Sequence, residues 1–154
     1  MDNGMIPIRE YVAANGNRCP RTVADVLLRQ LPEAVARWRS EQLSPCGRLR
    51  EEFIKVDATS GYVEITAPCA DEVADESDDV RDYGAIVSGL LATAMPRRHV
   101  NHRVERFVDA CRRGDYATMG DVMLAVERRK SGAVYVVLVI VVVALVALLA
   151  WLNA

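Results

Sequence analysis

Apolar residues recur at helical spacing along most of the first 130 positions. The clearest run follows Thr22, where apolar residues three or four apart fall on one face of a helix. Pro32 interrupts this run, and a proline inside a helix removes one backbone hydrogen bond and clashes with the preceding turn. The pattern therefore predicts a long amphipathic helix that is kinked or split at Pro32. Its apolar positions are Val23, Leu27, Leu31, Val35 and Trp38.

Shorter segments flank this helix. Pro7 favours the start of a first helix, and the polar and glycine residues at 15–17 favour its end. The apolar positions between Leu49 and Val56 predict another short helix. Residues 62–66 alternate between apolar and polar as a strand does, but we expect so short and isolated a segment to form no sheet.

The segment from Tyr83 to Met95 is apolar on nearly every side. Such a helix is buried, and about thirteen residues are too few to cross a bilayer. The acidic run at 71–79 before it predicts a helix with a solvated polar face, and residues 100–111 and 119–126 predict two more amphipathic helices. We expect an all-α domain over residues 1–130, with amphipathic helices around one hydrophobic helix.

The last segment, from Ala133 to Leu152, contains no charged residue, glycine or proline. At ~1.5 Å per residue it covers roughly 30 Å, the thickness of the hydrocarbon core of a bilayer. Arg128, Arg129 and Lys130 precede it, which places the domain on the cytosolic side. Residues 131–154 are therefore predicted to be a transmembrane tail anchor, in the mitochondrial outer membrane or the endoplasmic reticulum.

Length and charge narrow the function. A chain of 154 residues favours one domain, and a net charge of −2 gives no basic field for nucleic acid. The four cysteines are scattered without a C-x-x-C pair, so neither a metal site nor a disulfide framework is expected. Because no polar residues converge as in an active site, we expect no enzyme and no cofactor.

Three segments resemble the homology motifs of the Bcl-2 family of apoptosis regulators. Residues 82–87 read DYGAIV, similar to NWGRIV in the first motif. Residues 114–119 read GDYATM, similar to GGWDTF in the second motif. Residues 28–35 read LRQLPEAV, similar to the third motif, Leu-Arg-x-x-Gly-Asp-x-apolar, with Pro32 in place of Gly and Glu33 in place of Asp. The resemblance covers roughly residues 22–152.

The resemblance implies a bundle around a central hydrophobic helix, usually with a tail anchor. It implies an inhibitor of apoptosis that sequesters the BH3 helices of pro-apoptotic proteins in a hydrophobic groove at a membrane. A partner's amphipathic helix would enter that groove through apolar residues spaced by one turn. A second copy of the chain is a further possible partner. Carried over by position, the groove residues are Val35, Trp38, Val73, Tyr83, Gly84, Ala85 and Val87.

The sequence departs from the family at two points. The first motif of the family has an arginine that pairs with an aspartate of the bound helix, and Ala85 stands there. Loss of this arginine lowers the affinity for partner helices or narrows the range of partners, unless another cation, such as Arg81 or Arg39, replaces it. The first and second motifs are also closer together than in the family, by about one helix. Compact, divergent members of this kind are typical of viruses.

Other functions remain open from the sequence alone. A pro-apoptotic member of the same family would have the same pattern. A tail-anchored tether or adaptor without a groove is a further alternative, although Pro96 and Gly114 interrupt the long heptad run that a tether of the SNARE type needs.

Overall fold

The computed structural model describes residues 4–41, 47–57, 60, 62–66, 74–95 and 101–128. The chain divides into two compact units, Met1–Met123 and Leu124–Ala154, and the fold below is that of the first unit. Val73 and the predicted membrane span lie outside the described residues. Among the described residues, no helix is both long and apolar enough to cross a membrane.

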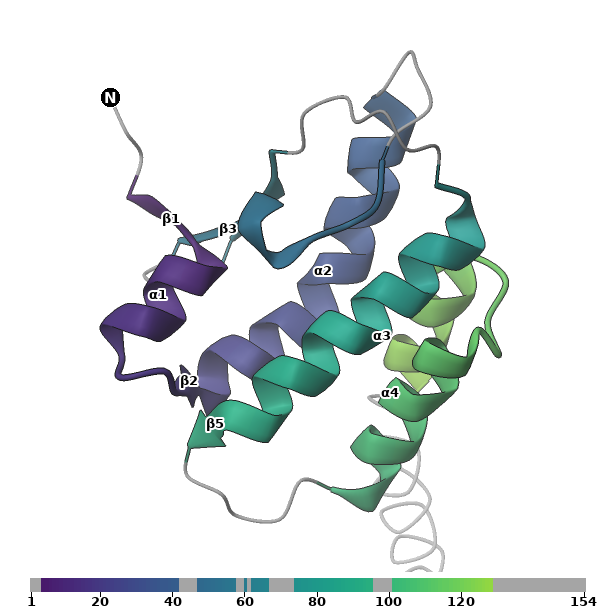
Figure 1. The fold of residues 1–154 in the computed structure, drawn as a ribbon. Helices are drawn as coiled ribbons and strands as arrows, with labels where there is room; N and C mark the ends of the chain where they lie inside the picture. The colour runs from purple at the N-terminus through teal and green to yellow at the C-terminus, as the bar shows by residue number, and fades with distance from the viewer. Residues whose placement is uncertain are drawn as a thin grey trace, which may run out of the picture. The chain divides into compact units, whose positions relative to one another are not determined.

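Most of the described chain is helical, with short strands between the helices (Figure 1). The helices are α1 (Ile8–Ala14), α2 (Arg21–Glu41), α3 (Glu76–Thr93) and α4 (His102–Arg113), with a 3₁₀ turn at Glu51–Phe53. Residues 119–128 are also helical. The strands are β1 (Met5–Pro7), β2 (Cys19–Pro20), β3 (Ile54–Asp57), β4 (Val63–Ile65) and β5 (Ala94–Met95).

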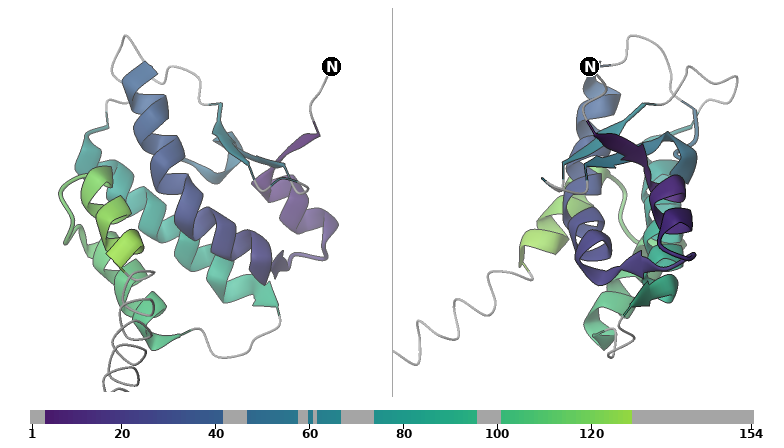
Figure 2. Two further views of the ribbon diagram at one scale, coloured as in Figure 1. Left: turned by 180° about the vertical axis from the view of Figure 1, so that it is seen from behind. Right: turned by 90° about the vertical axis from the view of Figure 1, so that its left-hand side faces the viewer.

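Helix α3 packs against both α2 and α4, and the core lies along these contacts (Figures 1 and 2). The predicted apolar face of α2 is buried throughout, as expected from its spacing. Burial of each such side chain contributes roughly 1.5–3 kcal/mol. The side chains with almost no exposed surface include Leu27, Leu31, Val35, Tyr83, Val87 and Val108.

One face of α3 is exposed, which corrects the prediction of a helix buried on all sides. Arg81, Ala85, Gly89 and Ala92 are exposed, while the side chains on the opposite face are buried. Because alanine and glycine are small, a helix with these residues outside still exposes little apolar surface. The apolar count of the segment therefore overstated its burial.

The all-α prediction is wrong in one respect, because the domain contains a small sheet. Strands β1, β3 and β4 form an antiparallel sheet in that order, and β2 pairs in parallel with β5. Residues 62–66 were expected to form no sheet, yet Val63–Ile65 pairs with Ile54–Asp57. The short helix expected between Leu49 and Val56 is helical only at Glu51–Phe53, because Ile54 and Val56 are buried in strand alternation.

Pro32 does not split α2, which runs without a break from Arg21 to Glu41. Pro32 lacks the backbone N–H that would bond to the carbonyl of Leu28, four residues earlier. The Tyr83 hydroxyl donates to that carbonyl oxygen at 2.7 Å, and this bond is buried. The side chain of Tyr83 therefore supplies the hydrogen bond that proline removes from the helix.

A double-mutant cycle tests this substitution of one donor for another. We expect Tyr83→Phe to lower the free energy of unfolding by about 1–3 kcal/mol, because it leaves the buried Leu28 carbonyl without its donor. In the background of Pro32→Ala, which restores the backbone N–H, the same change is expected to cost less than half as much. Chemical denaturation of the full chain measures both. Equal costs in the two backgrounds would show that the bond does not compensate for Pro32.

Candidate functional site

A line of contacts connects the three segments that carry the motif resemblance. Tyr83 of α3 bonds to Leu28 of α2, and its ring meets Phe107 of α4 edge to face, with centroids 6.5 Å apart. Phe107 in turn lies 5.8 Å from the ring of Tyr116, in the loop after α4. Segments that are far apart in the sequence thus meet through the Leu28 carbonyl and the rings of Tyr83, Phe107 and Tyr116.

A cleft of about 400 Å³ opens beside this line of contacts, and we call it the α2–α3 cleft. Its wall on α2 includes Val35, Ala36 and Arg39, and its wall on α3 includes Glu76 and Asp79. Residues 118–120, which follow α4, close it on a third side. Half-buried Ala36 gives it apolar surface above the buried Val35 and Met119, and the charged side chains give it polar groups at fixed positions, the usual composition of a binding site.

An ion pair between the two helices lines the cleft. Arg39 donates from Nε and Nη2 to the two carboxylate oxygens of Asp79, at 2.6 and 2.7 Å. The side chain of Asp79 is 1% exposed and that of Arg39 is 20% exposed. Burial raises the pKa of the Asp79 carboxyl above its usual value, although the bonds from Arg39 act in the opposite direction. The Arg39 guanidinium also lies over the Trp38 ring, 5.3 Å from its centroid.

Sequence reasoning missed Asp79, which it placed on a solvated face within the run at 71–79. Asp79 lies four residues before Tyr83 and so shares the buried face of α3 with it. The sequence did carry a signal: Asp79 falls on the apolar face of the helix, which indicates a buried carboxylate. A buried carboxylate needs a partner. That partner, Arg39, lies 40 residues away in the sequence, so no local pattern could identify it.

A second ion pair lies three residues further along α3. Arg48 donates from Nε and Nη2 to both oxygens of Asp82, at 2.8 and 2.6 Å, and lies 3.6 Å from Asp78. Asp78 also accepts from Arg81. These contacts hold the segment before β3 against the start of α3. Neither Arg48 nor Asp82 is among the residues that line the α2–α3 cleft.

The groove residues that were carried over from the family do not lie together on one surface of the structure. Val35 is fully buried yet borders the cleft, and Trp38, Tyr83 and Val87 are buried in the core. Ala85 is exposed, and it follows Asp79 by six residues, so it lies ~240° further round the helix. Arg39 lines the cleft, whereas Arg81 pairs with Asp78 at the surface. Whether any of these residues contacts a partner stays a prediction, as it does for Val73.

Gly84 allows a close approach, but the backbone that approaches it belongs to α4. A Cβ at position 84 would lie 2.7 Å from the backbone nitrogen of Arg112 and 2.9 Å from Cβ of Cys111. Contacts this short would force the two helices apart. The glycine of the first motif therefore has a packing function within the domain.

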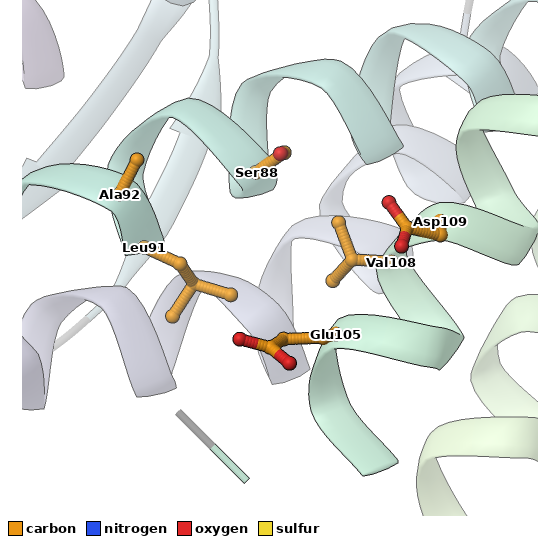
Figure 3. Close-up of a pocket in the computed structure, with 6 residues that line it drawn as sticks. All are labelled: Ser88, Leu91, Ala92, Glu105, Val108 and Asp109. Carbon is orange, nitrogen blue, oxygen red and sulfur yellow. The ribbon is translucent and has the colours of Figure 1, made fainter. Parts of the chain in front are cut away.

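A second hollow, of about 310 Å³, lies between α3 and α4 (Figure 3). Its lining residues are Ser88, Leu91, Ala92, Glu105, Val108 and Asp109. Both acids are more than half exposed, and each lies near a basic residue of its own helix, at 3.6 and 3.7 Å. Exposed pairs of this kind contribute little. Because its acids are solvated, this hollow is a weaker candidate than the α2–α3 cleft.

The described residues offer little for catalysis or metal binding. No group of three or more histidine, cysteine, aspartate or glutamate side chains among them could hold a metal ion. Burial raises the pKa of the Cys19 thiol to about 11, so this group stays protonated at neutral pH and is not a nucleophile. The arrangement of the α2–α3 cleft is suited to binding.

Comparison of the chain with models of protein families, with curated proteins and with solved structures gives no match. No relative therefore assigns a function to the α2–α3 cleft. Its role has to be inferred from its own residues and from the motif resemblance.

Two glycines of α3 provide a matched test of the α3–α4 packing. We expect Gly84→Ala to lower the free energy of unfolding by roughly 1–3 kcal/mol, because its Cβ would collide with α4. Gly89→Ala is the control, since its Cβ would meet only a Glu51 oxygen at 3.7 Å. That change should raise stability by about 0.5–1 kcal/mol, because alanine restricts the unfolded chain. Denaturant titration of the full chain measures both, and a neutral Gly84→Ala would contradict the packing assignment.

Proposed function

We propose that this chain inhibits apoptosis at a membrane surface by capturing the BH3 helices of pro-apoptotic proteins in the α2–α3 cleft. The supporting observation is the position of that cleft relative to the motif segments. Val35 belongs to the third motif segment and residues 118–119 to the second, while Asp79 lies one turn before the first. The cleft therefore lies where the segments that carry the resemblance come together.

The dimensions of the cleft favour capture of a helix through an anchoring side chain. Ligand pockets have volumes of about 300–1,000 Å³, and this cleft is near the lower limit. It accommodates one or two apolar side chains of a partner helix, whose remaining length would lie across α2 and α3. Met119 lines the cleft from within the core, and its unbranched side chain can adjust to an inserted side chain.

Titration of the full chain in nanodiscs with a panel of BH3 peptides tests this proposal. We expect at least one peptide to bind with micromolar or tighter affinity. Ala36→Trp should weaken that binding by about tenfold or more, because the indole ring would occupy the cleft. The matched control is Ala85→Trp, which adds the same ring on the exposed face of α3 and should leave affinity unchanged.

The outcomes of this titration distinguish the two possible binding surfaces. Loss of binding in Ala85→Trp alone would place the partner on the exposed face of α3, at the position where the family has its arginine. Absence of binding by every peptide would reject the proposal. The inhibitory direction is tested separately with isolated mitochondria, where the chain should reduce permeabilisation by an added pro-apoptotic protein. Increased permeabilisation would assign the chain to the pro-apoptotic members.

A further inference from the structure

We propose that Asp79 determines the specificity of the α2–α3 cleft, so that the cleft selects a partner helix with a neutral residue facing Arg39. An acidic residue at that position of the partner would bind less well. This inference rests on the proposed function, because it concerns the partner of the same cleft. It differs from what the motif resemblance implies, since the family's partner helix presents an aspartate to an arginine.

The first step of the argument is that Arg39 already has a carboxylate partner. Two of its N–H groups donate to both oxygens of Asp79, the two-point geometry that suits an arginine and a carboxylate best. The side chain of Asp79 is almost wholly buried, so it cannot turn into solvent to release the guanidinium. A partner's carboxylate would have to displace Asp79, which would then be buried without a partner.

The second step is the charge of the cleft. Among the described residues that line it, Arg39 is the only cation, whereas Glu76 and Asp79 are both acidic. The lining therefore carries a formal charge of −1 (one arginine against two acids). A carboxylate that enters would meet two charges of its own sign, and juxtaposed like charges oppose binding. An asparagine or another neutral residue meets no such repulsion.

The third step is that the position used by the family offers no alternative cation. Ala85 occupies the place of the family's arginine and is exposed on another face of α3. Arg81 lies 3.2 Å from Asp78 at the surface, and Arg48 is bonded to Asp82 outside the cleft lining. Each described arginine near the start of α3 is thus bonded to an aspartate of α3. Specificity in the cleft then depends on which of these aspartates holds the arginine of the lining, and that is Asp79.

The test uses two forms of one BH3 peptide, with aspartate or asparagine at the position whose contribution to affinity changes in Arg39→Gln, because that position faces Arg39. Both forms are titrated against the full chain in nanodiscs. The wild-type chain should bind the asparagine form more tightly, by about threefold to tenfold. Asp79→Asn should reverse this preference, because Arg39 then becomes available to the peptide's carboxylate. We expect the aspartate form to gain about tenfold in affinity in this variant.

Asp82→Asn is the matched control. It removes a carboxylate from the same helix and breaks an equivalent two-point bond, to Arg48, but lies outside the cleft lining. The wild-type preference should persist in this variant. If Asp79→Asn fails to fold, the double variant Arg39→Gln/Asp79→Asn replaces both charges by amides. It should then bind the two peptide forms equally.

The outcomes separate the inference from the proposed function. A wild-type chain that prefers the aspartate form, or an unchanged preference in Asp79→Asn, overturns the role of Asp79 and leaves helix capture standing. An equal reversal in Asp82→Asn also overturns it, because the effect would then come from the net charge of α3. Absence of binding by both peptide forms in every variant overturns both proposals.

Discussion

The hydrogen bond from the Tyr83 hydroxyl to the Leu28 carbonyl is the contact on which the arrangement of the helices depends. It joins residues 55 positions apart and satisfies an oxygen that Pro32 leaves without its helical donor. A buried carbonyl without a donor costs about 1–3 kcal/mol, so the bond favours the register of α3 in which Tyr83 reaches α2. The ring of the same tyrosine packs against Phe107 and sets the position of α4. One side chain therefore couples the three long helices.

The charged start of α3 could occupy the core only because each inward-facing carboxylate has a partner. The Asp75 side chain accepts from the backbone nitrogen of Asp78 at 2.7 Å and caps the helix, while negative charge in the first turn suits the helix dipole. Asp79 and Asp82 each receive an arginine from a different segment. A buried pair such as Arg39–Asp79 adds little net stability compared with apolar residues, but loss of one partner costs about 3–5 kcal/mol, whereas the more exposed Arg48–Asp82 pair contributes less. These pairs therefore fix how the segments dock, which is a requirement for a cleft of defined shape.

Periodicity predicted the parts of the fold that local pattern determines. The apolar face of α2 and the limits of α1 are confirmed, because a long periodic segment and flanking proline and glycine residues are local signals. The sheet was missed because Val63–Ile65, although it alternates, is short, and its pairing depends on partners that no local pattern identifies. Pro32 indicated a break in α2 because a local rule cannot foresee a donor from α3. The cleft residue Asp79 was missed for the same reason, since its partner Arg39 belongs to another helix.

The motif positions and the cleft have different functions in this domain. Tyr83 and Gly84, the residues that make the first motif segment similar to the family, face α2 and α4 and are used for packing. Residues of this kind determine how the helices cross. Residues that only line the cleft can be substituted without disturbing that crossing. Ala36, which is half-buried, meets this condition, whereas Arg39 and Asp79 line the cleft and also hold α2 against α3. The shape of the cleft and the crossing of α2 and α3 therefore depend on the same ion pair.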